Sequence, residues 1–122
     1  MQVGVTGFCM GGALSFKAAL LCPEISAATT FYGIPKEKDE LVRIRVPVQA
    51  HFGEKDNIVG FSSPADYGPL AEKLAAANVP YEMFTYPTGH AFTNQNEHNY
   101  SAECTALAFA RLYDFMKKHL GP

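Results

Sequence analysis

Short apolar runs alternate along this chain with longer segments in which apolar residues recur at helical spacing. Runs that are rich in β-branched residues and bounded by glycine or proline are typical of buried strands. Amphipathic segments that end near proline or in basic residues are typical of helices. The pattern predicts strands at 2–6, 27–33, 46–53 and 81–87, helices at 10–22, 66–78 and 97–120, and a charged surface segment with one or two helical turns at 35–44.

Strands that alternate with helices indicate an α/β fold, in which a parallel sheet is covered by helices. We therefore expect about four parallel strands, with the helix at 10–22 on one face of the sheet and the helix at 97–120 on the other. No internal repeat, low-complexity tract or linker interrupts the pattern. A chain of 122 residues fits one domain at most, so we expect residues 1–122 to form a single domain.

Composition narrows the classes of function. The formal net charge is −2 and no basic block is present, so we expect neither nucleic acid nor an anionic membrane surface as a partner. No apolar run approaches the roughly 18 residues of a membrane span, and no signal peptide is visible. The three cysteines are widely spaced, which argues against a disulfide framework and predicts a cytoplasmic location. No Cys/His spacing matches a zinc site, so we expect no metal.

The segment "GFCMG" (7–11) stands between a predicted strand and a predicted helix. In this context G-x-C-x-G is the nucleophile-elbow pattern, with cysteine in place of serine. The residues two before and two after the nucleophile approach each other in such a turn, so we expect a Cβ at Gly7 or Gly11 to clash. The turn places Cys9 at a helix N-terminus, which favours a thiolate, and the Met10 amide then faces an oxyanion. The alternative is a buried structural cysteine.

An activated cysteine needs a base, and the base needs an orienting acid. Asp56 follows the third predicted strand and His90 follows the fourth, and the carboxyl ends of parallel strands meet at one edge of a sheet. The chain order of nucleophile, acid and histidine is that of the α/β-hydrolases. Glu54 is a rival acid because it lies nearer the strand end, and Asp56 and His90 would each also fit an ordinary loop residue. His51 lies within a strand and fits a packed histidine better.

The segments "GVTGFCMGG", "FYG", "FGEKD" and "GHAFTN", in this order, resemble the dienelactone hydrolase family of α/β-hydrolases over essentially the whole chain. The resemblance implies hydrolysis of a small-molecule ester or lactone without a cofactor. It implies that Cys9 is the nucleophile, His90 the base and Asp56 the orienting acid. It also implies that the cysteine is activated on substrate binding, with a glutamate from the N-terminal half of the family fold taking part.

The length departs from the family pattern. Family members are about twice as long, and their elbow follows the fifth strand, so the resemblance covers the C-terminal half of the fold only. The earlier strands, the loop with the second oxyanion donor and the glutamate have no counterpart in these residues. We therefore expect an open sheet edge at 2–6 that pairs with another chain, making a homo-oligomer, and weak activity from this chain alone.

The segment after His90 departs from the family as well. Dienelactone hydrolases place an arginine a few residues after the histidine, where it holds the substrate carboxylate. Thr93, Asn94, Gln95 and Asn96 stand there in this chain. The resemblance therefore argues against dienelactone itself as the substrate.

Two other functions stay open from the sequence. One is a non-catalytic remnant that binds a partner, or itself, through the open edge of the sheet. The other is a thiol redox site at Cys9, although no C-x-x-C motif accompanies it.

Overall fold

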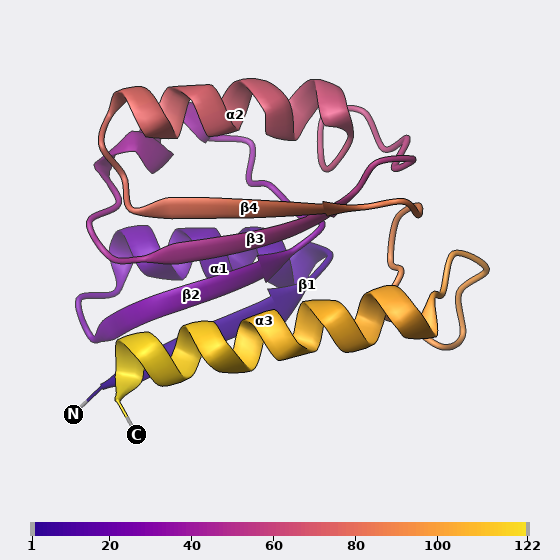
Figure 1. Cartoon of the computed structure of the whole chain (residues 1–122). Helices are drawn as coiled ribbons and strands as arrows, with labels where there is room; N and C mark the ends of the chain where they lie inside the picture. Colours follow the sequence, from indigo (N-terminus) through magenta and orange to yellow (C-terminus); the bar gives the residue numbers. More distant parts are fainter. Residues whose placement is uncertain (1, 122) are drawn as a thin grey trace.

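The computed structural model describes residues 2–121. At its centre lies a sheet of four parallel strands in the order β1-β2-β3-β4, and each strand is joined to the next by a helical crossover (Figure 1). The elements are β1 (Val3–Phe8), α1 (Met10–Leu21), β2 (Ile25–Phe31), the 3-10 helix η1 (Lys38–Arg43), β3 (Val48–Gly53), α2 (Pro64–Ala76), β4 (Tyr81–Tyr86) and α3 (Ala102–Leu120).

The predicted α/β fold is confirmed, and each expected strand and helix is present near its predicted bounds. Capping side chains explain the differences at two helix starts. The last helix begins at Ala102, later than predicted, because the Ser101 hydroxyl accepts a backbone N–H of its first turn. Helix α2 begins at Pro64, earlier than predicted, because Ser63 and Asp66 form a capping box around it.

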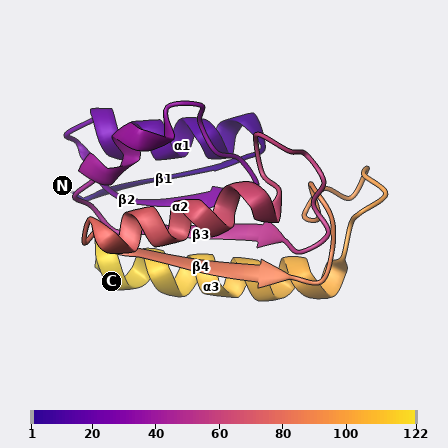
Figure 2. The ribbon, with the colours of Figure 1, turned by 90° about the horizontal axis from the view of Figure 1, so that it is seen from above.

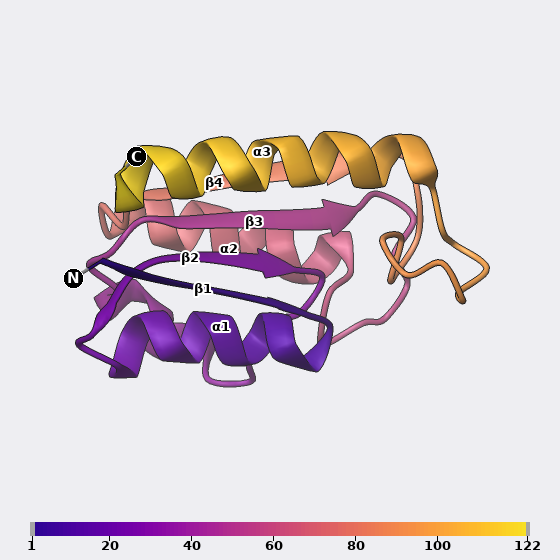
Figure 3. The same ribbon diagram turned by 90° about the horizontal axis from the view of Figure 1, so that it is seen from below.

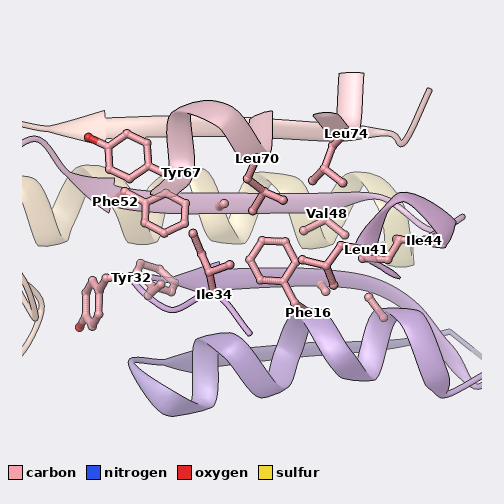
Figure 4. Close-up of a cluster of buried hydrophobic side chains, with 14 of the residues drawn as sticks. Phe16, Tyr32, Ile34, Leu41, Ile44, Val48, Phe52, Tyr67, Leu70 and Leu74 are labelled. Atoms are coloured by element: carbon pink, nitrogen blue, oxygen red, sulfur yellow. The ribbon is translucent and has the colours of Figure 1, made fainter. Parts of the chain in front are cut away.

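Helices cover both faces of the sheet, with α1, η1 and α2 on one face and α3 on the other (Figures 2 and 3). The expectation that α1 and α3 lie on opposite faces is thus confirmed. Val48 and Phe52 of β3 point into the apolar cluster on the first face (Figure 4). Phe16, Leu41 and Leu70 reach the same cluster from α1, η1 and α2, and all of these side chains are buried. This packing holds the carboxyl ends of the strands in fixed relative positions.

A buried polar network occupies the other face, between β3, β4 and α3. Gln49 Nε2 donates to Glu82 Oε1 and to the Arg111 carbonyl, so Gln49 Oε1 accepts from His51 Nε2 at 2.8 Å. Tyr86 Oη accepts from Arg111 Nη1 and donates to His51 Nδ1 at 2.7 Å. Burial, with a smaller effect of the Arg111 guanidinium, lowers the pKa of His51 from 6.5 to about 3. His51 is therefore a neutral, packed histidine, as the sequence predicts.

The first strand lies at an open edge, as predicted. Among residues 2–121, no strand pairs with the side of β1 that faces away from β2. Phe8, at the end of this strand, is 40% exposed. Met10, Leu14 and Leu21 are also exposed, on α1.

The neutral state of His51 predicts a pH dependence of stability. The ring takes up a proton on unfolding below its ordinary pKa of 6.5, so the native state loses stability as pH falls from there toward 3. We expect the free energy of unfolding to drop by about 2 kcal/mol between about pH 7 and pH 5 from this group. Urea unfolding at both pH values measures the drop, and His51→Gln should abolish this part of it. An equal drop in His51→Gln would show that other groups cause it.

Candidate active site

Cys9 occupies a sharp turn between β1 and α1. Its backbone has φ 59° and ψ −119°, a region that non-glycine residues rarely adopt. The Cys9 N–H donates to the Phe31 carbonyl at the end of β2, at 2.9 Å. The Cys9 carbonyl in turn accepts from Gly12 and Ala13 in the first turn of α1. These backbone bonds hold the side chain exposed at the N-terminus of the helix.

The elbow needs Gly7 but does not need Gly11 for the predicted reason. A Cβ on Gly7 would lie 2.1 Å from the Gly11 carbonyl oxygen, a clash between backbone atoms that side-chain movement cannot relieve. A Cβ on Gly11 would meet nothing within 4 Å among the residues that the structure describes. The prediction of a clash at Gly11 is therefore wrong, because the Gly11 carbonyl, and not its Cα hydrogen, faces β1.

Two other glycines, which the sequence reading did not single out, allow the close approach. A Cβ on Gly12 would lie 2.5 Å from the Phe31 carbonyl oxygen, and a Cβ on Gly33 would lie 1.9 Å from the Cys9 carbonyl oxygen. Because both residues lack a Cβ, the start of α1 packs closely against the end of β2 and the residues that follow it. Gly12 is the second glycine of the "GG" after the elbow, and Gly33 ends "FYG". The sequence does not reveal their role, because each contacts a segment that is distant along the chain.

The side chains of Cys9, His90 and Asp56 lie together at the carboxyl edge of the sheet. His90 Nε2 is 3.4 Å from Cys9 Sγ, and His90 Nδ1 is 2.8 Å from Asp56 Oδ2. The Asp56 side chain is fully buried, whereas 14% of the His90 side chain is exposed. Glu54, the rival acid, is exposed and accepts a hydrogen bond from Thr85 on the surface of β4. Asp56 is therefore the carboxylate that faces His90.

Local hydrogen bonds hold the acid in place. Asp56 Oδ1 accepts the Ile58 N–H at 3.0 Å, which leaves Oδ2 for the imidazole. Ser62 lies further along the same loop, and its buried Oγ is 3.1 Å from His90 Nδ1. The sequence reading missed Ser62, because its place beside His90 depends on how two loops meet.

A second set of contacts fixes the loop that carries His90. Asn99 Nδ2 donates to the His90 carbonyl at 3.0 Å, and a Cβ on Gly89 would lie 2.7 Å from the Asn99 side chain. Tyr32 packs edge-on against the imidazole, with ring centroids 5.0 Å apart. The Tyr32 hydroxyl also pairs with Thr93 Oγ1 at 2.5 Å, and burial raises the pKa of Tyr32. The hydrogen bond to Asp56 and the packing of Tyr32 together limit the movement of the imidazole.

A cavity of about 530 Å³ opens beside Cys9 and His90. Its wall is mainly apolar, and the loop that follows His90 lines part of it. The Met10 amide, the first of α1, donates to no other group within residues 2–121. The lining residues are Phe8, Cys9, Tyr32, His90, Ala91, Thr93, Asn94, Glu97 and Phe109.

The remaining cysteines lie away from this cavity. Cys22 is exposed beyond the far end of α1, and Cys104 is half-buried in α3. No cluster of three metal-ligating side chains occurs in the described part of the chain. The geometry is therefore that of a cysteine and a histidine that line an apolar cavity, with a buried carboxylate on the other side of the histidine.

A model of known protein families, described as "Dienelactone hydrolase family", matches residues 1–120. This chain belongs to the dienelactone hydrolase family. The carboxymethylenebutenolidase of Pseudomonas putida is 31% identical over 118 residues, which cover 94% of this chain and 48% of that protein. Protein usf of Aquifex pyrophilus is 34% identical over 123 residues, which cover 98% of this chain and 52% of that protein. The chain spans about half the length of these curated relatives.

Solved structures of dienelactone hydrolase-like proteins and esterases share the fold. A dienelactone hydrolase-like promiscuous phosphotriesterase from metagenomic libraries matches with a TM-score of 0.82 at 20% identity, over 98% of this chain and 53% of that chain. A Pyrococcus furiosus esterase matches with a TM-score of 0.77 at 15% identity, over 98% of this chain and 54% of that chain. Within residues 2–121, no helix combines the length and the apolar character that crossing a membrane requires.

The two elbow glycines should respond in opposite directions to the same substitution. Gly7→Ala should lower the free energy of unfolding by about 3 kcal/mol or more, because the new methyl group meets backbone. Gly11→Ala should raise it by about 0.5–1 kcal/mol, because alanine is the better helix former and the space is open. Urea unfolding of both variants tests this. Equal losses would mean that Gly11 is packed as tightly as Gly7.

Proposed function

We propose that this chain carries the catalytic groups of a cysteine-dependent hydrolase that acts on a carboxylic ester or lactone. The observation that carries the proposal is the chain of contacts from Cys9 Sγ to His90 Nε2, at 3.4 Å, and from His90 Nδ1 to Asp56 Oδ2, at 2.8 Å. A nucleophile within reach of a base, with the base oriented by a buried acid, is the arrangement that acyl transfer needs. Membership of the dienelactone hydrolase family supports the same reaction class.

The hydrogen bonds give each group a role. The Nδ1–H of His90 donates to Asp56, so the lone pair of Nε2 faces Cys9 Sγ and accepts its proton. The sulfur then attacks the acyl carbon, and the carbonyl oxygen becomes an oxyanion. The imidazolium returns the proton to the leaving alcohol as the tetrahedral species collapses to a thioester. Water, deprotonated by His90, hydrolyses the thioester and restores the thiol.

The oxyanion lies beside the N-terminus of α1 in this scheme. The Met10 N–H is the first amide of that helix and donates to no other group in the described residues. Met10 follows Cys9 directly, so its N–H is the donor nearest to the oxyanion that forms when the Cys9 sulfur attacks the acyl carbon. The positive end of the helix dipole adds to its effect.

Turnover by these residues alone should be slow. The Met10 amide is a single donor, and the loss of one oxyanion donor costs about 10²–10³ in rate in other acyl-transfer enzymes. The cavity is also open beside the exposed ring of Phe8, so water reaches the reacting groups. Slow turnover is a property that we propose for the 122-residue chain on its own.

A redox function at Cys9 is less well supported. Neither Cys22 nor Cys104 lies beside the cavity, so the described residues contain no partner thiol that would resolve an oxidised Cys9. The exposed cysteine is instead in contact with a base that is itself oriented by an acid.

The open edge of β1 favours self-association as a second property. Antiparallel pairing of β1 with β1 of a second copy would continue the sheet across a two-fold axis. Helix α1 packs over both β1 and β2, so this pairing would place two α1 helices about 10 Å apart, near the usual distance for packed helices. A Cβ on Gly11 would meet nothing within 4 Å among the described residues, so the start of α1 has open space beside it. At the opposite edge, the charge of Glu82 on β4 disfavours pairing with another chain.

Ester hydrolysis should depend on Cys9 and not on the other exposed cysteine. Cys9→Ala should reduce hydrolysis of p-nitrophenyl acetate to the buffer rate, because the nucleophile is lost. His90→Gln should lower the rate by about 10²–10⁴ through loss of proton transfer. Cys22→Ala is the matched control and should leave the rate unchanged, since Cys22 lies beyond the far end of α1. Hydrolysis that persists in Cys9→Ala would refute the proposal.

Self-association can be tested with the same substitution on each edge of the sheet. Thr6 of β1 and Thr85 of β4 are both exposed. Thr6→Lys should give a monomer in light scattering at a concentration at which the unaltered chain is a dimer, because it puts a charge in the paired edge. Thr85→Lys should leave the dimer intact. A monomeric unaltered chain, or equal effects of both variants, would exclude pairing through β1.

A further inference from the structure

The loop that follows His90 contributes one carboxylate, that of Glu97, to the lining of the cavity. Glu97 is the one carboxylate among the residues that line it, and no lysine or arginine is among them. The Glu97 carboxylate makes no hydrogen bond or ion pair with any residue in the range 2–121. The aromatic side chains of Phe8, Tyr32 and Phe109 also line the cavity. The cavity thus combines aromatic faces with an uncompensated negative charge.

Backbone contacts hold Glu97 at this position. The Asn94 carbonyl accepts the Glu97 N–H, and the Ala91 carbonyl accepts the Asn94 N–H, so the loop folds in consecutive turns. The Phe92 carbonyl accepts the Ser101 N–H at 3.0 Å, which ties the loop to the start of α3. The charge therefore belongs to a defined part of the rim.

We propose that this site selects uncharged or ammonium-bearing esters over carboxylate-bearing ones, with Glu97 as the residue that sets the preference. The inference rests on the proposed function, because Cys9 and His90 define the reacting end of the cavity. An anionic substrate loses hydration in the apolar cavity and meets the Glu97 charge without a compensating cation. A quaternary ammonium is attracted both by Glu97 and by the faces of the surrounding aromatic rings. Asn94, which also lines the cavity, offers a neutral amide and so adds no positive charge.

The preference can be measured without turnover, by the reaction of Cys9 with two methanethiosulfonate reagents of similar size and opposite charge. The Cys9 thiolate attacks the sulfenyl sulfur, a mixed disulfide forms, and methanesulfinate leaves. The trimethylammonium reagent should react faster than the sulfonate reagent, relative to their rates with 2-mercaptoethanol. Peptide mapping follows Cys9, and Cys22, at the far end of α1, serves as the internal reference because it lies beyond the screening length of Glu97.

Glu97→Gln should lower the ratio of the cationic to the anionic rate at Cys9 by about three- to fivefold at low salt, as removal of one nearby exposed charge predicts. Glu72→Gln, an exposed residue of α2 outside the cavity, makes the same change in net charge and should leave the ratio unchanged. About 0.5 M NaCl should weaken the preference of the unaltered chain. Equal ratios in the unaltered chain and Glu97→Gln, or equal shifts in both variants, would overturn the inference.

A second set of rates separates this inference from the proposed function. The acyl groups of the p-nitrophenyl esters of 4-(trimethylammonio)butyrate, butyrate and succinate are positively charged, uncharged and negatively charged, respectively. Glu97→Gln should lower the ratio of kcat/KM for the cationic ester to that for the anionic ester by the same three- to fivefold factor. Hydrolysis of all three esters with no change in this ratio would refute the inference alone. A charge preference in the labelling of Cys9 without any hydrolysis would refute the proposed function alone.

Discussion

The rest of the site depends on the packing of the Cys9 backbone against the end of β2. The Cys9 N–H donates to the Phe31 carbonyl, and its own carbonyl lies so close to Gly33 that a Cβ there would stand 1.9 Å away. This packing maintains a backbone conformation that a cysteine rarely adopts. The strained turn points the sulfur away from the sheet and toward His90, and it starts α1 directly behind the sulfur. One backbone contact therefore fixes both the position of the sulfur and the start of the helix.

The parallel sheet then brings the other two groups to the sulfur. Asp56 follows β3 and His90 follows β4, so both loops leave the sheet at the edge where Cys9 stands. The Asp56 carboxylate is fully buried, and its two oxygens accept from the Ile58 amide and from His90. A buried carboxylate needs such partners, because burial without them would be costly. The same bonds that stabilise the acid therefore orient the imidazole.

The sequence was sufficient for features that depend on chain order and local pattern. Strand–helix alternation predicted the parallel sheet, and the position of Cys9, Asp56 and His90 after successive strands predicted that they meet at one edge. It was insufficient where distant loops determine the contact. Ser62 joins His90 across two loops, and nothing in its own sequence context indicates that. Gly11 shows the converse error: the motif predicts crowding there, whereas a Cβ would meet nothing within 4 Å among the described residues.

The central claim is that the sulfur of Cys9 forms the bond to the acyl group. Rapid acid quenching of the chain with p-nitrophenyl butyrate, followed by peptide mass mapping, tests this claim directly. The account predicts a butyryl group on the peptide that contains Cys9, which neutral hydroxylamine removes because it is a thioester. Butyryl groups that are found on lysines only, or that resist hydroxylamine, would contradict the account, since the cysteine would then take no part in the chemistry.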